Sequence, residues 1–233
     1  MRANLDALAV LNTCRDDGGR WADAEEQTAL ARWSGWGAIP QVFDDDDDRY
    51  AAERAELRRL LRSEEGWAQA RRTTLNAHYT SASVVRAMWR VAGALGAEGE
   101  IRVLEPGCGS GNFIGLAPTG ARLTGIELDQ TTAEIAKHLY GARATIHASA
   151  FEDLRLEEGA FDVVIGNVPF AKVTPHDPRH NRGRHALHNY FLIKSLHLTR
   201  PGGLVVALPP RYTLDARNPA ARREMASMAD LVG

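Results

Sequence analysis

The chain lacks several features on which whole classes of protein depend. Its 233 residues include two cysteines, which argues against a disulfide framework and fits a reducing cytoplasm. It has no apolar run long enough to cross a membrane and no signal-peptide core near its start. Basic residues are not in excess, since the net charge is −2 at pH 7, so the footprint of a stand-alone nucleic-acid binder is absent. We therefore expect a cytoplasmic globular protein without membrane contact.

The first third of the chain carries helical patterns. Apolar residues recur at helical spacing through residues 2–15, 23–33, 50–62 and 67–72. Stretches that contain glycine or proline separate these segments. The acidic run Asp44–Asp48 predicts a solvated, mobile loop. We predict an all-helical N-terminal region over residues 1–78.

From residue 79 onward, strand and helix patterns alternate. A helix capped by Ser81 or Ser83 comes first. It is followed by predicted strands over 101–104, 122–126, 144–147, 161–165 and 204–208 and predicted helices over 113–116, 131–139, 186–198 and 219–228. This alternation predicts an α/β fold of the Rossmann-like type over residues 79–233, a mostly parallel sheet with helices on both faces. The last residues, Leu231-Val232-Gly233, are typical of the start of another strand.

A glycine-rich turn after the first of these strands is the most informative local pattern. Glycine lets backbone N–H groups at a helix N-terminus come close to a ligand. The dinucleotide fingerprint is G-x-G-x-x-G, so the G-x-G-x-G spacing found here departs from a nicotinamide-binding loop. The turn resembles instead motif I of methyltransferases. The residues that this resemblance assigns to the cofactor are Glu105, Pro106, Gly107, Gly109, Gly111, Asn112 and Phe113.

The second predicted strand ends in the acidic residue Glu127. An acidic side chain at this place can accept hydrogen bonds from ribose hydroxyls. Glu127 is therefore the predicted ribose ligand, and Leu128 beside it is a further predicted cofactor contact. The alternative is that the acidic residues merely cap the next helix, which fits Asp129 better than Glu127.

A second motif, Asn167-Val168-Pro169-Phe170, follows a predicted strand. Open α/β sheets bind their ligands at the carboxyl ends of strands. The motif resembles the Asn-Pro-Pro-Tyr/Phe sequence of methyltransferases that act on amino groups. The Asn167 side-chain oxygen and the Val168 carbonyl can accept hydrogen bonds from the N–H groups of an aryl amine, which makes its lone pair more available. Asn167 is also a predicted cofactor contact, as is Glu152. Pro169 stiffens the turn and Phe170 can stack on a flipped base. The alternative is a strand-ending turn in which Asn167 only caps.

Two more segments are carried over from this resemblance. Tyr79 and Thr80 match motif X, whose residues touch the methionine part of the cofactor, while a simple N-cap explains the segment equally well. Phe151 matches motif III and is expected to pack on the cofactor adenine. Glu152 or Asp153 substitutes for the acid that usually precedes this phenylalanine.

The stretch from Lys172 to His188 is rich in histidine and arginine: His176, His180, His185, His188, Arg179, Arg182 and Arg184. Zinc is one interpretation, but the spacing matches no usual site and no cysteine joins, so no metal site is predicted. A polar, mobile loop beside the active site is favoured. Its basic side chains either contact a nucleic-acid backbone or are simply solvated.

Four segments together resemble one family along nearly the whole chain: Arg32–Pro40, Thr74–Thr80, Glu105–Gly109 and Gly166–Phe170. This family comprises the adenine-N6 DNA methylase regions of phage, plasmid and conjugative-element proteins, often fused to a Swi/Snf-type helicase. The resemblance implies a Rossmann-like methyltransferase fold with S-adenosylmethionine as cofactor. It also implies DNA with a flipped-out adenine as substrate, and a role in restriction-modification or anti-phage defence on mobile elements.

Sheets of this family normally finish with an antiparallel pair of strands, for which too little chain remains. We therefore expect a fragment, or a sheet completed by something else. Sequence specificity would then come from the helical region, from a helicase or target-recognition partner, or from a missing C-terminal segment. Two alternatives stay open. One is methylation of a protein glutamine or an RNA base, and the other is a non-catalytic cofactor-binding or DNA-docking module of a larger assembly.

Overall fold

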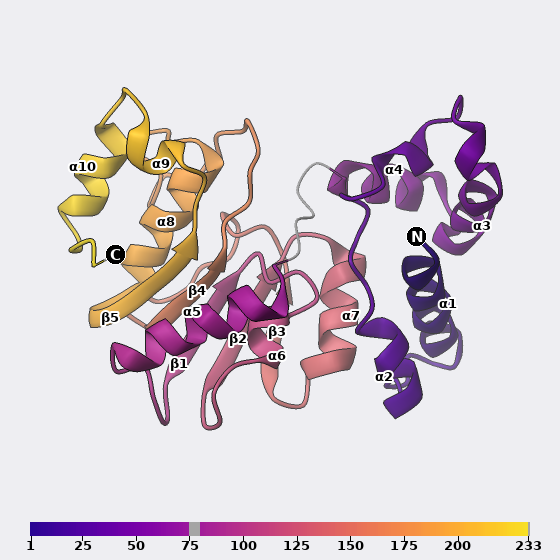
Figure 1. The fold of residues 1–233 in the computed structure, drawn as a ribbon, viewed down its shortest axis with the longest axis horizontal. Coiled ribbons are helices and arrows are strands. Elements are labelled where there is room, and N and C mark those ends of the chain that lie inside the picture. The colour runs from indigo at the N-terminus through magenta and orange to yellow at the C-terminus, as the bar shows by residue number, and fades with distance from the viewer. Residues whose placement is uncertain (75–79, 233) are drawn as a thin grey trace.

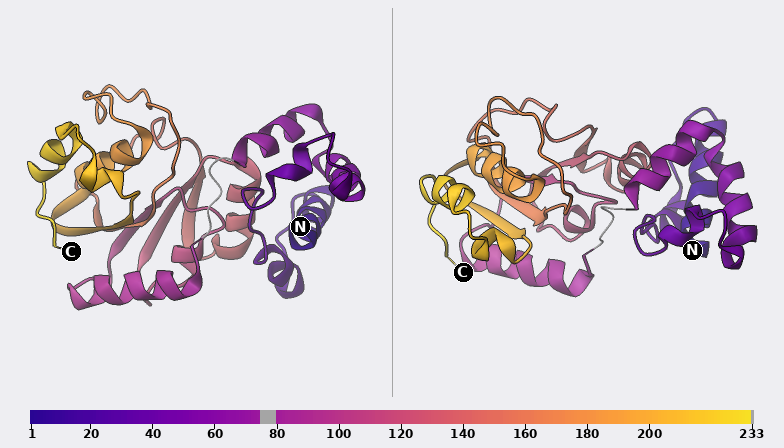
Figure 2. Two further views of the ribbon diagram at one scale, coloured as in Figure 1. Left: turned by 45° about the horizontal axis from the view of Figure 1, so that its top comes forward. Right: turned by 90° about the horizontal axis from the view of Figure 1, so that it is seen from above.

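The computed structural model describes residues 1–74 and 80–232 of the chain. Helices α1–α4 gather at one end of the molecule and a sheet with its own helices at the other, with α7 between them (Figures 1 and 2). In the helical region the elements are α1 (Arg2–Asp16), α2 (Ala24–Leu30), η1 (Pro40–Phe43), η2 (Asp48–Tyr50), α3 (Ala51–Leu61) and α4 (Glu64–Thr73). In the second part they are α5 (Ala82–Ala94), β1 (Arg102–Pro106), α6 (Asn112–Gly115), β2 (Arg122–Glu127), α7 (Gln130–Tyr140), β3 (Ala144–Ala148), β4 (Phe161–Asn167), α8 (Leu187–Leu198), β5 (Thr199–Leu208), α9 (Tyr212–Asp215) and α10 (Ala220–Ala226).

The helical region has a hydrophobic core of its own. Leu5, Leu8 and Leu11 recur at helical spacing on α1 and are almost fully buried. Trp36 and Trp67 pack edge-on against Phe43, with ring centroids 5.9 Å and 4.8 Å apart. The predicted helices of this region are therefore confirmed, and their apolar spacing is explained by one shared core. The division of the chain at residue 78 stays a prediction.

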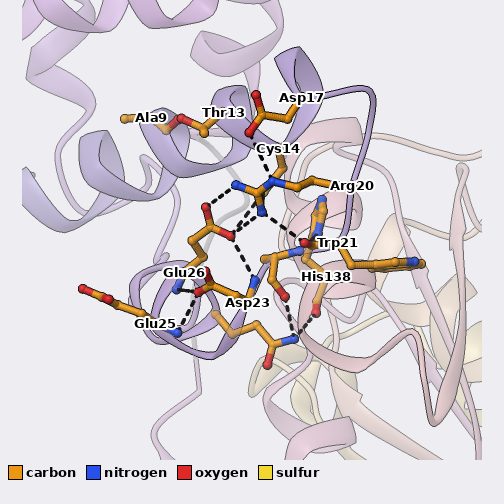
Figure 3. Close-up of polar contacts among 12 residues, drawn as sticks. Ala9, Thr13, Cys14, Asp17, Arg20, Trp21, Asp23, Glu25, Glu26 and His138 are labelled. Carbon is orange, nitrogen blue, oxygen red and sulfur yellow. Dashed lines mark hydrogen bonds and ion pairs between the residues drawn. The ribbon is translucent and has the colours of Figure 1, made fainter.

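Helix α2 begins in a dense polar cluster (Figure 3). Asp23 caps the helix and forms a capping box with Glu26. The Arg20 guanidinium donates two hydrogen bonds of 2.7 Å to the Glu26 carboxylate, which lowers the pKa of Glu26 to about 2. The helix ends at Leu30, three residues before the predicted end, because the chain then turns to bury Trp33.

The acidic run after η1 is more organised than its composition predicts. Arg54 on α3 is buried, and its guanidinium donates to the backbone carbonyls of Asp44, Asp45 and Asp47. Asp47 also caps η2 through the N–H of Arg49. The side chains of Asp44, Asp45 and Asp46 are exposed, as predicted for a solvated loop, while Arg54 binds the backbone carbonyls of the segment. The predicted mobility of the loop stays a prediction.

The second part of the chain forms a five-stranded sheet in the order β3-β2-β1-β4-β5. β1 pairs with β2 and β4, β2 with β3, and β4 with β5, each time in parallel. Successive residues of β4 point to opposite faces. Val163 and Ile165 pack with α5, α6 and α7, whereas Val164 packs with α8. The predicted α/β fold, Rossmann-like with helices on both faces, is confirmed.

The last strand and the end of the chain differ from prediction. β5 starts at Thr199, five residues earlier than predicted, and the β4–β5 pairing has an irregularity between Phe161 and Val163. Leu231 and Val232 are largely exposed and lie outside any strand, so the expectation of a further strand is wrong for these two residues. Among residues 1–74 and 80–232, no helix has both the length and the apolar character to span a bilayer.

The tight packing over β2 gives a stability prediction. A Cβ at Gly125 would lie 2.8–2.9 Å from Ile114, Cys108 and Ile146, so Gly125→Ala is expected to lower the free energy of unfolding by about 1–3 kcal/mol through overpacking. Gly93→Ala on α5 is the matched control, because its Cβ would meet only ordinary contacts and alanine favours a helix by about 1 kcal/mol. Denaturant melts of the two variants test this. Equal stability of the two variants would contradict it.

Candidate active site

The two predicted motifs meet at the centre of the sheet. From β1 the chain proceeds to β2 and β3 on one side and later to β4 and β5 on the other, so the crevice between the carboxyl ends of β1 and β4 is the topological switch point. A Cβ at Gly166 would lie 3.7 Å from Cγ of Glu105. The structure therefore brings the glycine-rich turn and Asn167, the last residue of β4, side by side.

The glycine-rich turn needs its glycines for conformation. Gly107, Gly109 and Gly111 have φ angles of 71°, 55° and 90°, which L side chains rarely adopt. The turn is closed by Gly111 N–H, which donates to the Cys108 carbonyl at 2.9 Å. A Cβ at Gly111 would also come within 2.7 Å of the Tyr140 ring. The backbone of the turn can consequently approach a ligand that a side chain would exclude.

Glu105 ties β1 to the helix that follows the turn. Its side chain is buried, and one carboxylate oxygen accepts the N–H of Ile114 on α6 at 3.2 Å. Burial raises the pKa of Glu105 well above its usual range. Pro106 is buried beside it. The structure shows both residues buried at the start of the turn, and the cofactor contacts assigned to them stay predictions.

Helix α6 is joined to the segment before α5. The Asn112 side-chain amide donates to the Thr80 carbonyl at 3.1 Å, so two predicted cofactor residues lie together. Phe113 is buried, and its carbonyl accepts the indole N–H of Trp89 at 3.0 Å. Tyr79, the other predicted residue of this segment, lies outside the described residues.

The Glu127 carboxylate joins the end of β2 to the glycine-rich turn. One carboxylate oxygen accepts the N–H of Gly109 at 2.9 Å and the other accepts the N–H of Asp129 at 2.8 Å. Burial raises the pKa of Glu127 to about 7, against the opposite effect of these two hydrogen bonds. Asp129 is the N-cap of α7, as the sequence indicated. Leu128 between them is 65% exposed, which leaves an apolar side chain next to the carboxylate.

The motif III residues are placed less favourably. Phe151 is buried, and its ring packs on Phe191 with centroids 4.9 Å apart. An adenine contact from this ring requires it to reorient, and that contact stays a prediction. Glu152 is half-buried next to it. Cys108 is also buried, which raises the pKa of its thiol well above the usual range and leaves no thiolate for nucleophilic chemistry.

The residues after Asn167 pass from the core to the surface. Val168 is buried among side chains that pack on α8, Pro169 is half-buried, and Phe170 is 36% exposed. The motif thus follows directly on the carboxyl end of β4, and its aromatic side chain reaches the surface. This placement suits the roles predicted for these residues, which stay predictions.

The loop that follows the motif is packed, not merely solvated. Asp177, His180, Asn181 and His185 are buried. The Asp177 carboxylate accepts hydrogen bonds from the Tyr190 hydroxyl at 2.9 Å and from Nζ of Lys194 at 3.2 Å. Burial works to raise the pKa of Asp177, but hydrogen bonds from His180 and Tyr190 outweigh it and hold the pKa well below its usual range. His180 and His185 are thus packed inside, whereas Arg182 and Arg184 are exposed, and the mobility of the loop stays a prediction.

Lys194 is a structurally central residue that the sequence patterns did not reveal. It lies on α8 with its ammonium group almost fully buried, donating to the carbonyls of Phe151 and Leu154 as well as to Asp177. One lysine thereby joins the motif III segment to the loop after Asn167. The available signal was a lysine within the apolar run of α8, in a chain with very few lysines. Within the described part of the chain, no group of His, Cys, Asp or Glu is arranged to hold a metal ion.

Comparison with known proteins agrees with this geometry. Residues 103–184 match the family described as a methyltransferase domain. A class I S-adenosylmethionine-dependent methyltransferase from Listeria monocytogenes has a similar fold, with a TM-score of 0.51 and 14% identity over 97% of this chain and 77% of that one. The match and the fold imply S-adenosylmethionine as the cofactor. The contacts assigned to Glu127 as ribose ligand, and to Leu128 and the glycine turn as further cofactor residues, stay predictions.

Two curated proteins are similar in sequence. The defense against restriction protein B of Escherichia phage P1 is 26% identical over 165 residues, which is 69% of this chain and 7% of that protein. The type II methyltransferase M.CvrRI of Paramecium bursaria Chlorella virus XZ-6E is 34% identical over 115 residues, 46% of this chain and 30% of that protein. The chain spans less than a third of the length of either relative.

The raised pKa of Glu127 gives a prediction for cofactor binding. The ionised carboxylate is the form that accepts hydrogen bonds from two ribose hydroxyls, so affinity is full above the pKa of about 7 and declines as the pH falls through it. Affinity for S-adenosylhomocysteine is expected to fall by up to about tenfold from pH 8 to pH 6, measured by calorimetry. Glu127→Gln is expected to bind weakly with little dependence on pH. The same pH dependence in that variant would show that another group is responsible.

Proposed function

We propose that this chain transfers a methyl group from S-adenosylmethionine to the exocyclic N6 amino group of an adenine in DNA. The observation that carries the proposal is the position of Asn167 at the carboxyl end of β4, beside Glu105 and the glycine-rich turn of the cofactor site. The cofactor supplies an electrophilic methyl group on a sulfonium. The task of the protein is to present a nucleophilic nitrogen in line with it.

The Asn-Val-Pro-Phe motif meets the needs of an aryl amine. Its lone pair is delocalised into the ring, and hydrogen bonds from both N–H groups to acceptors favour a tetrahedral nitrogen. The Asn167 side-chain oxygen and the Val168 carbonyl are the proposed acceptors. Valine in place of proline at the second position is expected to have little effect on catalysis, because the group used there is a backbone carbonyl. The exposed ring of Phe170 is the proposed stacking surface for an adenine flipped out of the duplex.

The charge at the rim of the site supports a nucleic-acid substrate over a protein glutamine. Two segments leave the carboxyl edge of the sheet, the loop after β4 and the chain after β5. Basic side chains are exposed on both, among them Lys172, Arg182, Arg184, Arg211 and Arg217. Exposed apolar side chains lie among them, namely Val173, Tyr212 and Leu214. A basic rim with apolar surface suits phosphates and unstacked bases.

The helical region has the opposite character. Residues 1–74 contain fifteen acidic and eleven basic side chains, so their net charge is negative. We therefore place the DNA on the rim rather than along the helices. The names of the phage and viral relatives support a setting in restriction-modification or defence against it, and a helicase or target-recognition partner is part of the proposal.

The catalytic role of Asn167 is tested by methyl transfer to unmethylated duplex DNA. The expected product after digestion is N6-methyladenine, and Asn167→Ala is expected to reduce its formation by about 10²–10³-fold, because the variant has no oriented acceptor for the reacting amino group. Cofactor binding by the variant should fall far less than methyl transfer. Methylated glutamine or RNA as the only product, or no transfer by a protein that binds cofactor, would contradict the proposal.

The DNA-binding rim is tested by salt dependence. Arg182→Gln combined with Arg211→Gln is expected to weaken DNA binding and to reduce the slope of log affinity against log salt by about one for each phosphate that is no longer neutralised. Arg71→Gln with Arg72→Gln on α4 is the matched control, because it removes equal charge from the helical region. The measurement is fluorescence anisotropy with labelled duplex at several salt concentrations. An equal loss of DNA affinity in both double variants would show that the rim is not the DNA-binding surface.

A further inference from the structure

A continuous chain of hydrogen bonds runs from the helical region to the carboxylate at the end of β2. The indole N–H of Trp33, in the segment after α2, donates to the Thr132 hydroxyl at 3.0 Å. That hydroxyl donates to the Asp129 carboxylate at 2.7 Å. The backbone N–H of Asp129 then donates to Glu127 at 2.8 Å. Four residues thus connect the core of the helices to the proposed ribose ligand.

The donors fix the direction in which protons are donated along this series of hydrogen bonds. An indole nitrogen can only donate, so the Thr132 oxygen must accept from Trp33 and turn its own proton toward Asp129. The backbone N–H of Thr132 donates to the same Asp129 oxygen at 2.8 Å. Trp33 and Thr132 are both buried, so water does not compete for these bonds. Asp129 is therefore held in one orientation, and its N–H stays aimed at Glu127.

Other contacts between the helical region and α7 lie farther from the site. Arg15 pairs with Glu134 in the middle of α7, at a partly exposed position. The N–H of Ala22 and the side chain of Gln27 donate to His138 near the end of α7. These contacts hold the helix without touching its N-cap. Trp33 differs from them because it donates to Thr132, whose hydroxyl in turn binds the N-cap Asp129.

We infer that the helical region positions the cofactor site, with Trp33 and Thr132 as positioning residues that hold Asp129, and through it Glu127, in the orientation that meets the ribose. The inference rests on the proposed role of Glu127 as ribose ligand. The helical region then has a part in cofactor affinity that is separate from any contact with substrate. A change that weakens the packing of the helical region on α7 would therefore lower affinity for the cofactor more than the rate of methyl transfer.

The test measures binding of S-adenosylhomocysteine by calorimetry to the full chain. Trp33→Phe keeps an aromatic ring and removes the donor, and Thr132→Val keeps the shape and removes the hydroxyl. Each is expected to weaken binding by about three- to tenfold, the effect of one hydrogen bond. Thr132→Ser retains the hydroxyl and should bind like the wild type. Glu134→Gln is the matched control, since it weakens the same interface away from the N-cap.

A second comparison separates positioning from general loss of structure. If the series of hydrogen bonds from Trp33 acts through Glu127, Trp33→Phe should not weaken cofactor binding further in a Glu127→Gln background. The inference is overturned if Trp33→Phe and Thr132→Val bind like the wild type, or if Glu134→Gln weakens binding as much as they do. If Glu127→Gln alone bound the cofactor like the wild type, the proposed ribose contact would be wrong. The hydrogen bonds from Trp33 would then have no cofactor ligand to position.

Discussion

Two carboxylates held against a single glycine-rich turn are the constraint on which the site depends. Glu105 lies under the turn and Glu127 beside it, and both accept hydrogen bonds from backbone N–H groups. Burial and the repulsion between the two carboxylates raise the pKa of Glu105. Such a pair is costly in an apolar interior. Each carboxylate is compensated by backbone donors, the N–H of Ile114 for Glu105 and the N–H groups of Gly109 and Asp129 for Glu127.

The loop after Asn167 is built on a second buried cluster of charged side chains. Asp177 and Lys194 neutralise each other inside the protein and share their remaining hydrogen bonds with Tyr190 and with the carbonyls of Phe151 and Leu154. A buried pair of this kind adds little stability but strongly disfavours any arrangement that separates its partners. The loop after Asn167 is thereby fixed relative to α8.

The sequence predicted the fold better than the details of the site. Apolar periodicity and glycine spacing are local properties, and α1, α7 and the strands from β1 to β4 lie close to their predicted ranges. Two features that the sequence patterns did not reveal are the hydrogen bonds from Arg54 to the carbonyls of the acidic run and from Lys194 to Asp177 in the loop. Periodicity carries no information about such partners. The burial of Phe151 arose in the same way, because its neighbours are on α8. The chemical roles of Asn167 and Phe170 follow from residue type and position and still depend on the resemblance.

Helix α7 belongs to two cores at once. Ala133 and Ala136 pack on the sheet, whereas Ile135 packs among the leucines and tryptophans of the helical region. A helix shared in this way makes the two halves a single cooperative unit, since neither can release α7 without exposing apolar surface of the other. The helical region therefore could not have been exchanged for another domain without a change in the packing of α7. A recombination event that moved the sheet alone into another protein would have to supply a new cover for Ile135.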